Sequence, residues 1–193
     1  GINTCVGADN EQLLGDVDLL GKRTCVHDDG VTGRSHIDGM LGGATLTPEQ
    51  TRQWQDLDRR NLQRLRQIVD SDGFPHSSQV GRDGVAAAWL LLQHADADPD
   101  FQSRMLSLLG TRDDPALSKE QLALLTDRVL TAQGKPQRYG SQYEGVGAEM
   151  KMKPVQAPAA LDQRRAAMGM MPSATYACLL KQLYAPASVP DAR

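Results

Sequence analysis

The sequence has no long apolar run, no surplus of positive charge and few aromatic residues. Its longest uninterrupted apolar stretch, residues 85–92, has eight residues, whereas a helix needs about 18 to cross a bilayer. The net charge of −3 lacks the excess of Lys and Arg with which proteins neutralise nucleic acid phosphates. We therefore expect neither a transmembrane segment nor nucleic acid binding. Since aromatic residues make up only 4% of the chain, Leu, Ala, Val and Met are expected to fill the core.

Cysteine is also scarce, with three among 193 residues. Cys5 and Cys25 lie in a Gly- and Asp-rich segment that has little capacity to form a core. We predict a disulfide between them, which would stabilise the fold by about 3 kcal/mol. Together with a first residue that is not Met, this favours an exported protein, periplasmic or secreted. The alternative is a cytosolic protein with two unpaired thiols. Cys178, in an apolar stretch, is expected to act as a small hydrophobic residue.

The length suits one well-packed domain. We expect an irregular, glycine-rich N-terminal arm over residues 1–46, a helical domain over residues 47–184 and a frayed tail over residues 185–193. The arm contains His27 and His36 close to several Asp residues. Because their spacing matches no known ligand pattern, we expect these residues to be solvated and predict no metal site.

Helix caps and apolar spacing predict a mainly α fold, a compact domain of several helices. The predicted helices are residues 47–70, residues 84–94, a third starting at Asp98-Pro99, a fourth starting at Ser118, and two short ones over residues 159–168 and 172–184. The first opens with a capping box of Thr47 and Gln50. The second is apolar almost all round, which is typical of a helix in the middle of a domain. Residues 76–81 are predicted to form a loop.

The fourth helix has two apolar faces, whereas a surface helix normally has one. The first face is lined by Leu122, Leu125 and Val129. The second has Leu124 beside Asp127 and Arg128, so a carboxylate and a guanidinium are expected to be buried there as an ion pair. The helix is predicted to stop at residues 134–136, a Gly-Lys-Pro stop signal. The following segment, residues 137–143, is rich in hydrogen-bonding side chains and indicates a site.

We predict that these polar groups converge on one pocket. His94 ends a helix that has no solvent face, and Asp127 and Arg128 interrupt the second face of a helix that also needs burial. Since a lone buried charge costs several kcal/mol, the groups must meet one another or line a wet cavity. The predicted catalytic residues are His94, Asp127 and Arg128, and the predicted ligand-binding residues are His76, Ser78, Gln93, Gln137, Tyr139 and Gln142.

Many of these residues lie in short motifs that occur together. The motifs are Gly73-Phe74-Pro75, Val80-Gly81, Gln93-His94-Ala95-Asp96, Leu125-Thr126-Asp127-Arg128, the segment from Gly134 to Gln142, and Leu161-Asp162-Gln163-Arg164-Arg165. In this combination the chain resembles a widespread bacterial family of unknown function, over about residues 50–184. Ser141 stands where the family pattern has Thr, and Leu161 where it has Val. The resemblance implies a site at these motifs and leaves the reaction open.

Three kinds of function fit the predicted site. In an enzyme, His94 would act as general acid or base, oriented by Asp127 or Asp96, and Arg128 would hold an anionic group of the substrate. No Ser or Cys has a recognisable nucleophile context, so a hydrolase that activates water or a lyase is expected. In a binding protein, the same residues would hold a small polar ligand or a cell-envelope component. In the third, they form a buried network that fixes loops. The sequence identifies neither a cofactor nor an oligomeric state.

Overall fold

The computed structural model of the protein describes residues 47–145 and 149–183. They form six α-helices, one short 3-10 helix and one two-stranded sheet, so the fold is mainly helical, as predicted. The predicted arm, the predicted tail, and Cys5 with Cys25 lie outside the described residues. Within the described ranges, no helix combines the length and the apolar character that crossing a bilayer requires.

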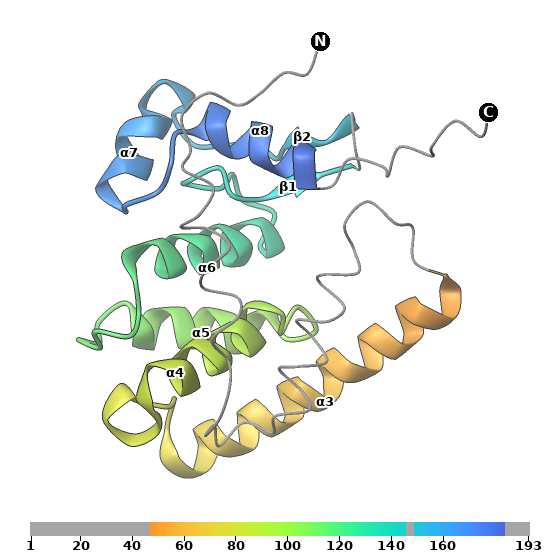
Figure 1. Cartoon of the computed structure of the whole chain (residues 1–193), viewed down its shortest axis with the longest axis vertical. Helices are drawn as coiled ribbons and strands as arrows, with labels where there is room; N and C mark the ends of the chain where they lie inside the picture. The colour runs from red at the N-terminus through yellow and green to blue at the C-terminus, as the bar shows by residue number, and fades with distance from the viewer. Residues whose placement is uncertain (1–46, 146–148, 184–193) are drawn as a thin grey trace, which may run out of the picture.

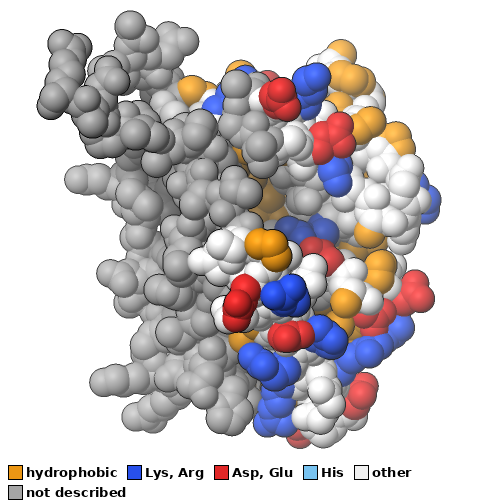
Figure 2. Space-filling view, turned by 90° about the vertical axis from the view of Figure 1, so that its right-hand side faces the viewer, with side chains coloured by type: hydrophobic (Ala, Val, Ile, Leu, Met, Phe, Trp, Pro, Cys, Tyr) orange, Lys and Arg blue, Asp and Glu red, His pale blue; other side chains and the backbone are white. Residues whose placement is uncertain are grey.

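The helix α3 (Pro48–Asp72) runs along the bottom of the molecule (Figure 1). It begins with the predicted capping box, in which Thr47 Oγ1 accepts the N–H of Gln50 and the Gln50 side chain accepts the N–H of Thr47. Leu62, Leu65 and Ile68 are buried on one face. The opposite face is charged, and Figure 2 shows basic and acidic side chains interspersed over the described part of one side of the molecule.

The helix α4 (Ser77–Gln93) begins earlier than the sequence predicted. The expected loop over residues 76–81 is in part helical, because the His76 side chain caps the first turn. The backbone leaves helical geometry only at Gly81, whose φ is 74°, and the helix is kinked there. Beyond the kink Val85 and Leu92 are fully buried, whereas Trp89 is half-buried. The helix therefore packs firmly on one side without being enclosed on all sides.

The helices α5 (Pro99–Leu109) and α6 (Lys119–Ala132) begin at the predicted caps, Asp98 and Ser118. They complete the main hydrophobic core with α3 and α4. Its buried residues from α5 and α6 are Phe101, Met105, Leu109, Leu125 and Val129. Leu108, although apolar, lies off the buried stripe of α5 and is 44% exposed. It lies beside the stripe because Met105 and Leu109, four residues apart, set the buried face.

The described chain ends in a C-terminal unit (residues 137–145 and 149–183) that packs on the other side of α6 (Figure 1). It contains the antiparallel strands β1 (Tyr143–Glu144) and β2 (Lys151–Met152), the short 3-10 helix η2 (Pro158–Ala160), and the helices α7 (Leu161–Ala167) and α8 (Ser173–Leu183). Ala123 of α6 packs there against Tyr139 and Met170, with Leu124 half-buried beside them. The predicted second face of α6 thus exists, and α6 is the helix between two packed layers.

Candidate functional site

Asp127 holds the polar loop that follows α6. Its carboxylate is fully buried and accepts three backbone N–H groups, from Arg138 at 2.7 Å, Tyr139 at 2.9 Å and Ser141 at 2.9 Å. The loop returns to Asp127 because α6 ends at Ala132 and the chain turns at Gly134, whose φ is 69°. The N–H groups of Gly134 and Lys135 donate to the carbonyls of Thr131 and Leu130, a helix-ending turn of the Schellman type. Both Asp127 oxygens are thus used inside the protein.

Gln137 is the second anchor of this loop and is also fully buried. Its Nε2 donates to the carbonyl oxygens of Gln142 at 2.9 Å and Lys153 at 2.8 Å. Its Oε1 accepts the N–H of Gln142 at 2.8 Å. The side chain of Gln142 donates in turn to Ser141 Oγ at 3.2 Å. Gln137 therefore joins the loop to Lys153, the residue that follows β2, and its amide hydrogens and its oxygen all have protein partners.

The glycine of this loop is required by its surroundings. Gly140 has a φ of 66°, a conformation that residues with a Cβ rarely adopt. A Cβ there would lie 2.9 Å from Met152 Sδ and 3.2 Å from Leu161 Cδ2. The glycine lets the loop pass closely between β2 and α7, which explains its place between Tyr139 and Ser141.

Two arginines of α7 complete the loop network. Arg165, only 1% exposed, donates through Nε to Met171 O at 2.6 Å and through Nη1 to Tyr139 O at 2.5 Å. Arg164 donates through Nε to Arg138 O at 2.9 Å. In the sequence, both arginines stand out only as part of the motif that carries the family resemblance. The missed signal is that Arg165 follows Leu161 by four residues, which places it on the buried face of α7.

Arg128 pairs with Asp96 instead of with its neighbour Asp127. Its Nη1 lies 2.9 Å and 2.7 Å from the two oxygens of Asp96. Consecutive helical residues point about 100° apart, so Asp127 faces the C-terminal unit while Arg128 faces the turn after α4. This ion pair brings the predicted Gln93-His94-Ala95-Asp96 segment, here named the 93–96 turn, to the side of α6.

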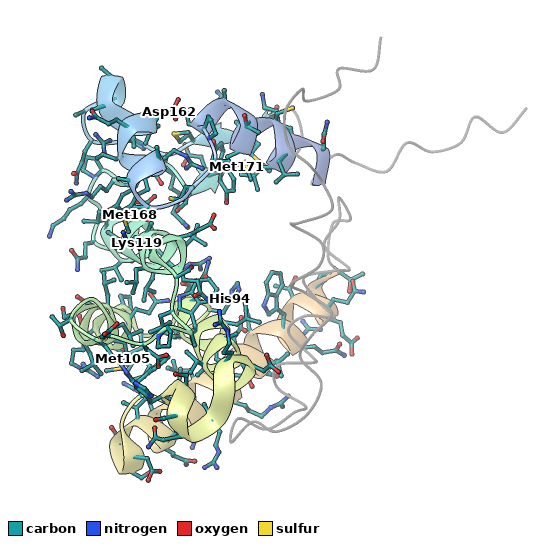
Figure 3. All side chains as sticks on the ribbon, turned by 60° about the vertical axis from the view of Figure 1, so that its left-hand side comes forward. His94, Met105, Lys119, Asp162, Met168 and Met171 are labelled. Atoms are coloured by element: carbon teal, nitrogen blue, oxygen red, sulfur yellow. The ribbon has the colours of Figure 1, made fainter. Side chains whose placement is uncertain are left out.

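The 93–96 turn is also held from α5. Gln102 is fully buried, and its Nε2 lies 3.1 Å from the carbonyl oxygens of Leu92 and Gln93 and 3.3 Å from Asp96 Oδ1. His94 is the C-cap residue of α4, with its backbone N–H donating to Leu90 O, and it is half-buried. Figure 3 shows His94 on the α4 side of α6 and the labelled Asp162 and Met171 of the C-terminal unit on the other.

Several buried polar atoms around this turn have no hydrogen-bond partner within the described structure. They are Trp89 Nε1, Gln93 Oε1, Gln102 Oε1 and Arg128 Nε. Trp89 lies one helical turn before Gln93, and the other three residues belong to the turn or bond to it. Native proteins contain few such atoms, because leaving a buried donor or acceptor unpaired costs free energy. Four such atoms lie around the 93–96 turn, so this region has hydrogen-bonding capacity that the described residues do not use.

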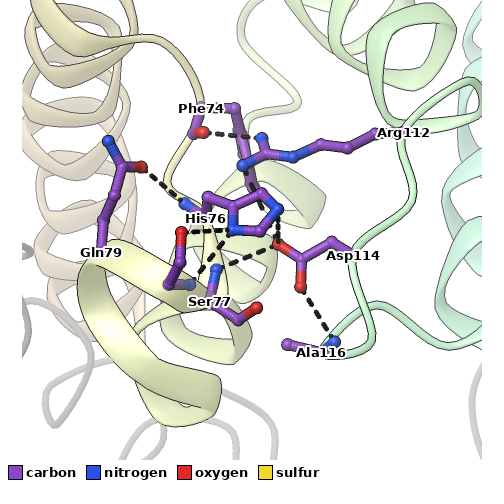
Figure 4. A network of polar contacts seen from close by, with 8 residues as sticks. Phe74, His76, Ser77, Gln79, Arg112, Asp114 and Ala116 are labelled. Carbon is purple, nitrogen blue, oxygen red and sulfur yellow. Dashed lines mark hydrogen bonds and ion pairs between the residues drawn. The ribbon is translucent and has the colours of Figure 1, made fainter.

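His76 and Ser78 belong to a different network, at the start of α4 (Figure 4). His76 Nδ1 accepts the N–H of Ser78 at 3.1 Å, and His76 Nε2 lies 3.8 Å from Asp114 Oδ2. Asp114 has a fully buried side chain that accepts the N–H groups of Ser77 and Ala116. Burial acts to raise the pKa of Asp114, but these hydrogen bonds and the His76 charge outweigh it and hold the pKa below its usual value. Asp114 belongs to none of the sequence motifs described above, so its role in this network was not predicted.

The structure therefore distributes the predicted site residues over three places. Asp127, Gln137, Tyr139 and Gln142 form the loop network, Gln93, His94 and Arg128 surround the 93–96 turn, and His76 and Ser78 cap α4. The last two stand at the opposite end of the 17-residue helix α4 from His94. Within the described ranges, no three His, Cys, Asp or Glu side chains are grouped as a metal site would require.

Comparison with known proteins places this arrangement in a family. No curated protein and no solved structure matches the chain. A family model described as "Family of unknown function (DUF6624)" matches residues 41–187. This range contains α3 to α8 and every residue of the three networks described above. The chain belongs to the DUF6624 family, a family of unknown function.

Proposed function

We propose that the protein is an enzyme, a hydrolase or a lyase, that binds a small anionic molecule at the 93–96 turn and moves a proton through His94. The observation that carries the proposal is the group of buried polar atoms without partners around this turn. Two of them are donors, on Trp89 and Arg128, and two are acceptors, on Gln93 and Gln102. A polar molecule that both donates and accepts hydrogen bonds would satisfy them.

Arg128 is suited to holding an anionic group. Asp96 uses only its Nη1, and Nε has no partner among the described residues. An arginine binds carboxylate or phosphate best through two parallel N–H groups, and the edge that includes Nε has an N–H that no described residue uses. Because the pair with Asp96 already fixes the guanidinium, less side-chain entropy is lost when an anion binds.

His94 supplies the group that can exchange a proton. It lies in the turn itself, next to Gln93 and two residues before Asp96. Histidine is the side chain most often used for general acid–base catalysis. Hydrolysis would need it to take a proton from water, and elimination would need it to take a proton from the substrate. In both cases Arg128 would fix the substrate beside it.

The loop network has a supporting role in this proposal. Asp127 has both oxygens bonded to backbone N–H groups of the loop, so we assign it to positioning α6 and not to contact with substrate. The same holds for Gln137, whose amide is used within the protein. Their substitution is expected to act through stability, whereas substitution at the 93–96 turn acts on binding and turnover.

The test is turnover of small carboxylates and organic phosphates by the full chain, followed by proton NMR of a substrate mixture. His94→Ala is expected to lower turnover by about 100-fold or more while ligand affinity stays within about threefold. Arg128→Lys is expected to weaken binding by about tenfold, because the planar fork is lost. Arg59→Lys is the matched control, since Arg59 is an exposed arginine that pairs with Asp56 on α3.

Three outcomes distinguish the alternatives. Binding without turnover in the unsubstituted protein would replace the enzyme proposal with a binding function for a polar ligand. A large loss of stability in His94→Ala, with no ligand found, would favour the buried network that fixes loops. If the Arg128→Lys and Arg59→Lys variants bind the ligand equally well, the proposal that Arg128 holds an anionic group is wrong.

A further inference from the structure

A second group of unpartnered polar atoms lies in the C-terminal unit, on the opposite side of α6 from the 93–96 turn. Arg165 is 1% exposed, and its Nη2 is buried without a partner among the described residues. The hydroxyl oxygen of Tyr143 on β1 is buried in the same way. Neither atom is used by the loop network, in which Arg165 donates through Nε and Nη1.

The two residues pack against one aromatic ring. The Arg165 guanidinium carbon lies 4.9 Å from the ring centroid of Tyr176 on α8. The ring of Tyr143 meets the same Tyr176 ring edge-on, with centroids 6.0 Å apart. The two donors without partners therefore belong to side chains that contact the same ring, at the junction of β1, α7 and α8.

The charge of Arg165 has no hydrogen-bonded carboxylate beside it in the described structure. Its described hydrogen bonds go to the backbone carbonyl oxygens of Met171, Tyr139 and Gly140. A buried cation without an anion is costly to a fold. Glu120, half-buried in the first turn of α6, feels this charge: burial raises the pKa of its carboxyl group, and Arg165 partly opposes the rise. Arg165 also acts to lower the pKa of Asp162, so Glu120 and Asp162 are the described carboxylates that would compete for the guanidinium.

We infer that Arg165 and Tyr143 form a binding site for the carboxylate group of a small organic acid. One carboxylate oxygen would accept from Arg165 Nη2 and the other from the Tyr143 hydroxyl. Two open donors match the two oxygens of a carboxylate, whereas a phosphate has more oxygens to satisfy and more charge to place near Glu120. The site shares no residue with the 93–96 turn, so it stands or falls independently of the proposed function.

Acetate is the simplest probe, and acetamide is its neutral control. We expect acetate to bind the full chain, detected by shifts in proton–nitrogen NMR spectra at residues of β1, α7 and α8, and acetamide to bind much more weakly. Tyr143→Phe is expected to weaken acetate binding about fivefold to tenfold, because one hydrogen bond to a charged group is lost. Glu120→Gln is expected to tighten it several-fold, since the competing negative charge is removed.

A second measurement needs no ligand. Tyr143→Phe keeps the ring that packs against Tyr176 and removes a buried hydroxyl without a partner, so the unfolding midpoint should stay the same or rise. Arg165 itself is a poor choice for substitution, because it ties three carbonyl oxygens together and its variants are expected to misfold.

Several results would overturn the inference. These are equal binding of acetate by the Tyr143→Phe variant, binding of acetamide as tight as that of acetate, and no binding of acetate by the full chain. A clear drop in the midpoint of ligand-free Tyr143→Phe would mean that the hydroxyl already has a partner. Loss of acetate binding in Arg128→Lys but not in Tyr143→Phe would move the carboxylate to the 93–96 turn.

Discussion

Asp127 and Arg128 are neighbours in sequence, yet α6 turns them toward different regions, and the protein uses the polar atoms of Asp127 more fully than those of Arg128. Asp127 faces a loop in which its oxygens and the Gln137 amide are used by the protein. Arg128 faces the 93–96 turn, where its own Nε and other buried polar atoms have no partner within the described structure. A completed network stabilises a fold, and the proposed function assigns the unpaired atoms of the turn to a ligand. Two neighbouring motif residues on one helix therefore differ in how completely the protein itself uses their polar atoms.

The largest expected effect comes from breaking the completed side. Asp127→Ala removes the acceptor of three backbone N–H groups that would stay buried, so the free energy of unfolding should fall by about 3–5 kcal/mol. Chemical denaturation measures it. Asp56→Ala is the control, because Asp56 is exposed and its pair with Arg59 is worth less than about 1 kcal/mol. Equal losses in the two variants would contradict the anchoring role of Asp127.

Substitutions at two glycines distinguish the cost of close packing from the cost of an unfavourable backbone conformation. Gly140→Ala combines a positive φ with contact to Met152 and Leu161, and should cost about 2–4 kcal/mol. Gly134→Ala has a similar φ, but no atom lies within 4 Å of the added Cβ, so about 1–2 kcal/mol is expected. Thermal unfolding of both variants gives the comparison. If Gly134→Ala costs as much as Gly140→Ala, close packing is not what selects glycine at position 140.

The Asp114 network at the start of α4 extends the comparison to a pH-dependent quantity. In the folded protein the pKa of the Asp114 carboxyl group is lowered below its ordinary value of 3.8. The stabilising contribution of the carboxylate is therefore fully present above that value. The contribution is lost as the pH falls from 3.8 through the lower folded pKa. Asp114→Asn should reduce the free energy of unfolding by about 1–2 kcal/mol at pH 7 and flatten its decline in acid. Unfolding midpoints at a series of pH values check this.

Asp113→Asn provides the matched control for that experiment, since Asp113 is exposed and next in the chain. It should leave both the neutral stability and the acid decline close to those of the unsubstituted protein. An acid decline that persists unchanged in Asp114→Asn would assign it to other carboxylates, among which Asp162 also has a lowered pKa because it accepts the Ser173 N–H.

The smallest effect on stability is expected on the incomplete side. Asp96 has a side chain that is 61% exposed, so Asp96→Asn should cost less than about 1 kcal/mol. Because it loosens the Arg128 guanidinium, anion binding at the turn should change much more than the unfolding midpoint does. Parallel titrations and melts of this variant and Asp127→Ala would show opposite patterns. A stability loss as large as that of Asp127→Ala would mean that both sides of α6 are structural.

The starts of α3, α5 and α6 could be predicted because capping by Thr, Asp or Ser is a local property, whereas the cap that His76 gives to α4 was missed. Thr47, Asp98 and Ser118 each cap a helix through residues three positions away, and no distant contact is needed to see this. The two-faced character of α6 could be predicted for a similar reason, since Leu124 and Asp127 lie on one side of any helix there. Local spacing also placed Gly134 at the helix end.

Partners far apart in the chain could not be predicted in the same way. Helical spacing shows that Arg128 points away from Asp127, but not that Asp96, 32 residues earlier, receives it. The strands β1 and β2 have two residues each, too few for an alternating pattern. Arg165 is buried although arginine carries no signal of burial, because backbone carbonyl oxygens from two loops surround it.

The adjacency of Asp127 and Arg128 on one rigid helix has a thermodynamic consequence. Asp127 fastens α6 to the loop at residues 138–141, and Arg128 fastens it to the 93–96 turn. A rotation of α6 about its axis displaces both attachments at once, so the two cannot change independently. If binding at the turn and opening of the loop both shift α6, their free energies are coupled, and such a coupling is reciprocal.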